Sequence, residues 1–199
     1  MGIKERKERQ KEELRQKIMN AATEILNKDG IDAVSIRNVA ARIEYSPRTI
    51  YLYFKDKDEL LQEIIESGFA VTVNNIEKIA ESDLLPEEKI KLFLHANIEM
   101  SQSNTNYYSA VVTLIHKKGY KPRQNQQKVA QFLESELKNF YDAKNIKGKD
   151  IQLIIILIAS FLRGFNMELI NLGKKITTEK KEIMVESCVN SIMKGVMQL

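Results

Sequence analysis

The 199-residue chain has few of the residues that break helices or cross-link loops. It contains eight glycines, three prolines, one cysteine and no tryptophan. A single cysteine, Cys188, excludes an intrachain disulfide and fits a reducing compartment, where it would fill the core or an interface. Apolar residues show no strand-like alternation bounded by turn residues, and helix-forming residues dominate. The sequence therefore predicts an all-α protein.

Other absences limit the classes of function. The two histidines, His95 and His116, belong to no metal-ligand spacing, and no P-loop, G-x-G-x-x-G or G-x-S-x-G motif occurs. We therefore expect no enzyme activity, no cofactor and no metal. The charged N-terminus lacks the apolar stretch of a signal peptide. The most apolar run, residues 153–162, is shorter than the ~20 residues that span a bilayer. The expected location is the cytoplasm, without membrane contact.

The pattern of apolar residues divides the chain into about nine helices. Pro47, Pro86 and Pro122 each stand just before an apolar segment, where the missing N–H of a proline costs nothing. The expected helices cover residues 7–28, 36–43, 47–54, 57–80, 86–102, 106–118, 122–143, 150–172 and 178–197. We predict a small N-terminal domain (1–56) and a larger helical body (57–199), joined without a flexible linker by the long helix from Lys57.

Two short helices separated by Glu44, Tyr45 and Ser46 predict a helix-turn-helix. The second helix would be held by its apolar residues, so that its first residues face outward, as in a helix that enters the major groove of DNA. Residues 35–57 hold five basic and two acidic side chains, which favours an anionic partner. The residues expected to pack the two helices together are Val39, Ala40, Ile43, Ile50 and Phe54.

The segment SIRNVAARIEYSPRTIYLYFKDKDELL resembles the N-terminal helix-turn-helix of the TetR family of bacterial transcriptional regulators. The resemblance covers about residues 18–61 and is most specific in IYLYFKDKDELL. It implies a homodimer that binds a palindromic operator in double-stranded DNA, with a divergent C-terminal domain that dimerises and usually binds a small molecule. By motif position it implies DNA contacts from Ser35, Arg37, Ser46, Pro47, Arg48, Thr49, Tyr51, Tyr53, Lys55 and Lys57.

Among these residues, Arg37 and Arg48 are expected to read bases, and Tyr51, Tyr53 and Lys57 to bind phosphates. The tyrosines could instead be core aromatics. Phe54 is expected in the core and Arg42 as a solvated charge. The N-terminal KERKERQKEELRQK, with its alternating charges, is interpreted as an exposed helix face, with a phosphate-binding arm as the alternative.

One residue departs from the family pattern. The family usually has glycine at the start of the turn, where φ is positive, and this chain has Glu44. A side chain in the left-handed region costs about 1 kcal/mol. The substitution also places an acidic group near the expected DNA surface.

The C-terminal body offers candidates for an effector site and a dimer interface. A pocket needs apolar walls and a few convergent polar groups. Polar residues within apolar helices are therefore candidates, although each could serve as a surface, paired or interface residue: His95, Asn97, Tyr107, Tyr108, Arg163 and Asn166. Residues 150–172 and 178–197 carry more apolar surface than a monomer needs, which predicts a two-fold, four-helix interface between two copies.

These features predict a sequence-specific transcriptional repressor released by a small hydrophobic or amphipathic effector. One alternative is an architectural or cell-division DNA-binding protein on the same scaffold, without an effector. Another is an enzyme or interaction module whose helix-turn-helix no longer binds DNA.

Overall fold

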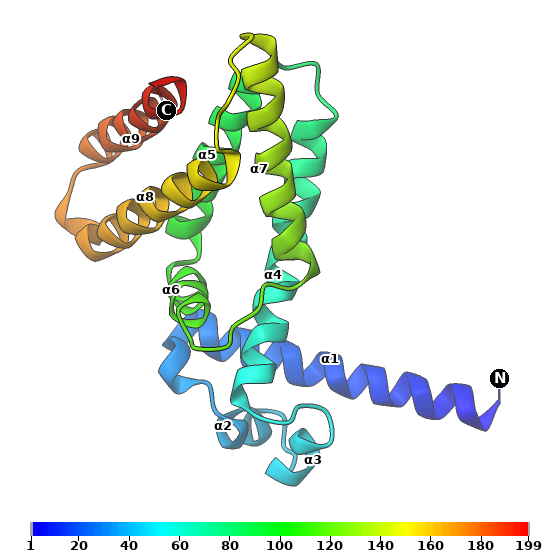
Figure 1. Ribbon diagram of the computed structural model, residues 1–199. Helices are drawn as coiled ribbons and strands as arrows, with labels where there is room; N and C mark the ends of the chain where they lie inside the picture. Colours follow the sequence, from blue (N-terminus) through cyan, green and yellow to red (C-terminus); the bar gives the residue numbers. More distant parts are fainter. Residues whose placement is uncertain (1, 199) are drawn as a thin grey trace. The chain divides into compact units, whose positions relative to one another are not determined.

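The computed structural model describes residues 2–198, so that the end residues of the two predicted domains, Met1 and Leu199, lie outside the described residues. All regular elements in this range are helices, which confirms the predicted all-α class. The α-helices in this range are α1 (Ile3–Asp29), α2 (Ile36–Arg42), α3 (Pro47–Tyr51), α4 (Lys57–Ala80), α5 (Pro86–Ser103), α6 (Thr105–Ile115), α7 (Gln124–Ala143), α8 (Ile151–Leu172) and α9 (Thr178–Gln198), and two 3₁₀ turns join them, η1 (Ile31–Ala33) and η2 (Gly173–Lys175) (Figure 1).

The chain folds into two compact units. Unit 1 comprises Met1–Gly68 and Asn106–Tyr120, and unit 2 comprises Phe69–Thr105 and Lys121–Leu199. α4 therefore supplies its first half to unit 1 and its second half to unit 2. α6 belongs to unit 1 although α5, which precedes it in the chain, belongs to unit 2.

Unit 1 holds the helix-turn-helix on a small apolar core. The five residues expected to pack α2 against α3 are all buried, and the two helices are in contact, as are α1 and α2. α3 ends at Tyr51 rather than at the expected Phe54, because the N–H groups of Leu52 and Tyr53 donate to carbonyls only three residues back. Such tight bonds close a helix. They turn Phe54 inward, and Phe54 is buried as predicted.

The turn between α2 and α3 has the left-handed residue that the family pattern implies. Glu44 adopts a φ of 63°. The Tyr45 N–H donates to the Ala40 carbonyl at 2.9 Å, and the Glu44 N–H to the Ala41 carbonyl at 3.3 Å. This pair of bonds is a Schellman motif, which satisfies the last carbonyls of α2 and usually has glycine at the left-handed position. The backbone of the turn is thus preserved despite the glutamate.

Glu44→Gly should raise the free energy of unfolding by about 0.5–1 kcal/mol, because glycine removes the Cβ strain but also frees the unfolded chain. Urea denaturation measures the change. Glu44→Gln is the matched control, since it removes the charge and keeps the Cβ. Equal stabilisation by both variants would contradict a conformational cause.

Unit 2 is a bundle of α5, α7, α8 and α9 with the second half of α4. Its core joins all five segments through apolar side chains that include Ile76, Leu94, Leu137, Ile158 and Val189. The Tyr141 hydroxyl donates to the Val196 carbonyl, which ties α7 to α9. Cys188 is buried in this core, and burial raises the pKa of its thiol to about 11, so it is a filler as expected.

α8 has two apolar faces. Its buried face consists of Ile154, Ile158, Leu162, Asn166 and Leu169. Its other face exposes Leu153, Ile156, Leu157 and Phe161. Among the described residues α8 is also the one helix that is long and apolar enough to cross a membrane by length and composition, although its most apolar run alone is too short. A helix of a soluble bundle that is buried on one side can have the same length and apolar composition. The exposed apolar face of α8 still needs a partner.

Candidate functional site

The two short helices of unit 1 begin at serine caps. The Ser35 Oγ accepts the Asn38 N–H at 3.1 Å, and the Ser46 Oγ accepts the Thr49 N–H at 3.2 Å. The hydroxyls of Ser46 and Thr49 are also 3.0 Å apart. The oxygens of both serines therefore hold the starts of α2 and α3, with Pro47 at the first position of α3.

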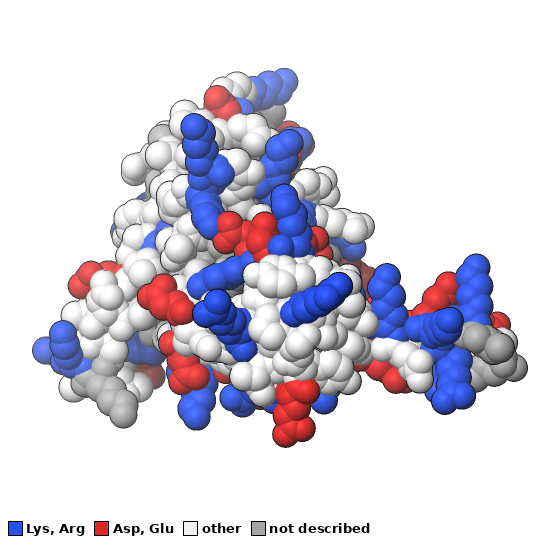
Figure 2. Space-filling model, turned by 90° about the horizontal axis from the view of Figure 1, so that it is seen from below, with Lys and Arg blue, Asp and Glu red and all other residues white. Residues whose placement is uncertain are grey.

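The outer side of α3, with α2 and the segment after α3, exposes a mixed basic and aromatic surface. Tyr51 is 56% exposed and Leu52 is 74% exposed, and Arg37, Arg48 and Lys55 are exposed as well. The side chain of Arg48 contacts no carboxylate within residues 2–198. Figure 2 shows the face that carries α2 and α3, with basic side chains around an uncharged centre and a few acidic groups between them. Such a surface suits phosphates and base edges.

Two basic residues of the segment 35–57 have partners within the protein. The Lys57 ammonium donates to the Ile31 carbonyl at 2.8 Å, so it braces the turn after α1. Arg42 is exposed, as expected of a solvated charge, and its Nη2 and Nε both donate to the Glu24 Oε2, at 2.7 and 3.1 Å. This surface ion pair joins α2 to α1. Of the five basic residues counted in the sequence, Arg37, Arg42, Arg48 and Lys55 are exposed, and among these four Arg42 is paired with a carboxylate, that of Glu24.

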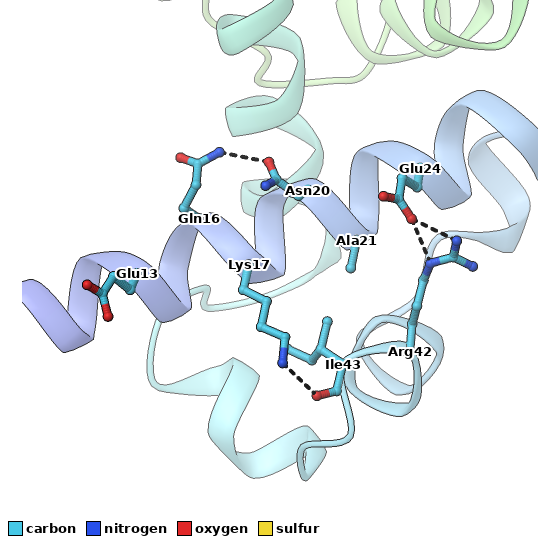
Figure 3. Close-up of a pocket in the computed structure, with 8 residues that line it drawn as sticks. All are labelled: Glu13, Gln16, Lys17, Asn20, Ala21, Glu24, Arg42 and Ile43. Atoms are coloured by element: carbon cyan, nitrogen blue, oxygen red, sulfur yellow. Dashed lines mark hydrogen bonds and ion pairs between the residues drawn. The ribbon is translucent and has the colours of Figure 1, made fainter.

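A shallow pocket between α1 and the end of α2 shows how the helix-turn-helix is held (Figure 3). The Lys17 ammonium reaches the Ile43 carbonyl at 3.4 Å and lies 5.3 Å from the centre of the Tyr45 ring. Opposite it, the Arg42–Glu24 pair closes the same pocket. Sequence reasoning missed Lys17 and Tyr45 as neighbours of the site. The position of Tyr45 directly after Glu44, the left-handed residue of the turn, could have indicated that its ring lies near the helix-turn-helix.

Four of the six effector-site candidates lie in unit 2. Asn166 is fully buried, and its Nδ2 donates to the Asn97 Oδ1 at 2.9 Å, which brings α8 and α5 together through a polar pair. The His95 Nε2 lies 3.6 Å from the Glu186 carboxylate. The Arg163 guanidinium donates to the Ser160 hydroxyl at 3.2 Å on α8. A groove beside His95 is lined by Ile98, Glu99, Gln102, Ser103, Lys181 and Val185.

The other two candidates, Tyr107 and Tyr108, lie in unit 1. Tyr108 is buried. The Tyr107 hydroxyl donates to the Ile65 carbonyl at 2.8 Å. Burial raises the pKa of Tyr107 above its ordinary value, so the hydroxyl stays protonated and keeps donating. The six candidates are therefore divided between the two units, and Tyr107 serves the attachment of α6 to α4.

Known proteins resemble part of this chain in sequence. A family model described as "Bacterial regulatory proteins, tetR family" matches residues 18–64. An uncharacterised HTH-type transcriptional regulator of Haemophilus influenzae is 32% identical over 68 residues, 34% of this chain and 36% of that protein. A fatty acid metabolism regulator protein of Bacillus subtilis is 24% identical over 96 residues, 48% of each chain. The matches thus span less than half the length of these curated relatives.

Solved structures show the same fold over nearly the whole chain. FadR from Bacillus subtilis, in complex with stearoyl-CoA, has a TM-score of 0.69 at 19% identity and covers 91% of this chain and 96% of its own. A TetR variant from Acinetobacter baumannii, in complex with minocycline, has a TM-score of 0.71 at 17% identity, with 91% and 94% covered. At these identities the likeness shows the fold alone.

Proposed function

Residues 18–64 make this chain a member of the TetR family of bacterial transcriptional regulators, and from that premise we propose a homodimeric, cytoplasmic repressor that a small hydrophobic or amphipathic effector releases from its operator. The exposed outer side of α3 carries the DNA-binding part of the proposal. Arg48 and Arg37 read base edges, and Tyr51, Lys55 and Tyr53 contact the backbone. The N-termini of α2 and α3 lie against the DNA backbone and are positioned by Ser35, Ser46, Pro47 and Thr49. Lys57 acts through the backbone near Ile31.

Arg48→Ala should weaken binding to each half of the operator by about 1–3 kcal/mol, roughly 5- to 150-fold, and relax the preference at one base pair of each half. Operators are first selected from random duplexes with the unmodified protein, and affinity is then measured by fluorescence anisotropy at several salt concentrations. If the unmodified protein shows no sequence-selective, salt-sensitive binding, the chain is not a DNA-binding regulator.

Arg42→Ala is the matched control for Arg48→Ala. It removes the same charge from the neighbouring helix, but from a guanidinium that already binds Glu24. We expect a change in operator affinity of only a few fold and no change in base preference. Similar losses for both variants would show that general charge, rather than a base contact, explains the effect of Arg48→Ala.

The dimer part of the proposal uses residues 150–172 and 178–197 of unit 2. The exposed apolar side chains of α8 follow helical spacing on one face, and α9 adds Ile183 and Met197. Ser160 and Gly164, both exposed on α8, are small enough to let a second helix come close. A two-fold pair of α8 and α9 would cover this surface. The dimer also presents two copies of α3 to the two halves of a palindrome.

The effector part of the proposal is drawn from unit 2. The buried Asn97–Asn166 pair and the groove beside His95 provide polar groups among apolar walls. In this proposal residues 1–56 bind DNA, and residues 57–199 bind the effector and form the dimer. Relatives of the same fold were solved with stearoyl-CoA and with minocycline, both of which combine apolar and polar parts.

A thermal-shift screen with stearoyl-CoA and minocycline as first probes tests release by an effector. A ligand at 100 times its Kd should stabilise the protein by about 2.7 kcal/mol. By linkage it should also lower operator affinity, and operator should lower ligand affinity by the same factor. A protein that binds its operator but responds to no metabolite, drug or acyl compound would instead be the architectural or cell-division type without an effector.

A further inference from the structure

The first half of α1 has no part in the function proposed so far. Residues 4–13 are exposed to solvent in unit 1. The helix begins at Ile3, earlier than the expected residue 7, so that a rigid rod rather than a loose tail carries these charges. Figure 1 shows this end of α1 extending beyond α3 within the same unit.

The charges of this rod are sorted by side. Along the sequence they alternate in sign, but an α-helix turns by about 100° per residue, and at that spacing most of them separate, with the Arg9–Glu13 pair between the two sides. The acidic Glu5, Glu8 and Glu12 share the opposite side of the rod. Its basic side, within an arc of about 160°, consists of Lys4, Arg6, Lys7, Lys11 and Lys17. A simple solvated face would not need this separation.

The basic side of α1 faces the helix-turn-helix. One groove in unit 1 is lined by Lys7, Lys11 and Lys17 from α1 and by Tyr45 and Tyr53 from the segments on either side of α3, together with Gln10, Glu13 and Leu14. Glu13 also pairs with Arg9 at 3.3 Å, one turn away on the helix. The groove therefore continues the surface of α3 along α1, with lysines on one wall and tyrosines on the other.

We propose that the basic side of α1, from Lys4 to Lys11, binds the DNA backbone outside the half-site read by α3. The inference rests on the proposed function, since it needs a protein that binds DNA. From Ile3 to Leu14 a helix is about 17 Å long, which matches about ten phosphate charges at one per 1.7 Å of duplex. Ammonium groups without a fixed planar geometry bind phosphates as point charges and carry no base information. α1 thus adds affinity and footprint without altering sequence preference.

The test compares the unmodified protein with the double variant Lys7→Gln/Lys11→Gln on two selected operator duplexes. The long duplex has about ten base pairs, roughly one helical turn, beyond the operator on each side, and the short duplex ends at the operator. On the long duplex the variant should bind about 100- to 1,000-fold more weakly, and the slope of log affinity against log salt should fall by about 3.6, because the dimer loses four phosphate contacts at about 0.9 each. On the short duplex the two proteins should bind alike, with the same base preference.

Arg9→Gln/Lys28→Gln is the matched control, because it removes the same charge from exposed positions of α1 away from the groove lysines. It should behave as the unmodified protein on both duplexes, and circular dichroism should show all variants folded. Equal affinity and salt slope for the groove variant and the unmodified protein on the long duplex would overturn the proposal. If the unmodified protein selects no operator at all, the proposed function fails first, and that outcome is visible before any variant is made.

Discussion

Gly68→Ala should lower the free energy of unfolding by about 2 kcal/mol, although alanine is the better helix former at an ordinary position. A Cβ on Gly68 would clash with the Tyr107 hydroxyl oxygen and with the ring carbon that bears it. Both residues belong to unit 1, and Tyr107 is held by its bond to the Ile65 carbonyl. The ring must move, which costs about 1–3 kcal/mol of strain and about 1 kcal/mol for the hydrogen bond, against a gain of about 1 kcal/mol in helix propensity.

Thermal and urea unfolding measure the loss, and two further variants identify its cause. Gly195→Ala is the matched control, since Gly195 also lies in a helix and its Cβ would have open space. It should be neutral or slightly stabilising. Tyr107→Leu shortens the side chain that the added methyl group would strike, so Gly68→Ala should cost at least about 1 kcal/mol less in that background. If Gly68→Ala is as stable as Gly195→Ala, the Tyr107 ring of α6 does not pack against Gly68.

Phe161→Glu should convert the proposed dimer to a monomer and lower operator affinity by about 100-fold or more. Phe161 is 51% exposed in the single chain and lies on the apolar face of α8 with Leu157 and Ile156. In a two-fold interface every change occurs twice. Two Phe161 side chains are therefore lost, and two carboxylates must either be buried in the interface or separate the two chains. Each monomer then has a single α3, so it loses the gain in operator affinity that a dimer obtains by binding two half-sites at once.

Sedimentation velocity gives the mass of each variant, and anisotropy with the selected operator gives the affinity. Val71→Glu is the matched control, because Val71 is also an exposed apolar residue of a unit 2 helix but lies on α4. It should remain dimeric and bind DNA normally. If Phe161→Glu remains a dimer, the copies associate through another surface, and the apolar face of α8 has a different partner.

Local chemistry made much of the DNA-binding unit predictable. Serine caps, proline at the first position of α3 and apolar spacing all act within a few residues, so the sequence predicted α2, the turn and the start of α3. The positive φ at Glu44 also followed, because the hydrogen bonds of the turn demand it whatever the side chain. The end of α3 was placed too late, since the N–H groups of Leu52 and Tyr53 donate to carbonyls three residues back and end the helix at Tyr51.

The sequence by itself determined the all-α class, the helix-turn-helix and the two apolar faces of α8, because helix periodicity and capping are written in neighbouring residues. Only the tertiary structure decided which basic residues have partners within the protein, since Arg42 and Lys57 find theirs, Glu24 and Ile31, far along the chain. It likewise placed Tyr107 against Gly68 and turned the lysines of α1 toward Tyr53. Contacts between distant segments depend on how helices pack, and no pattern within one helix specifies them.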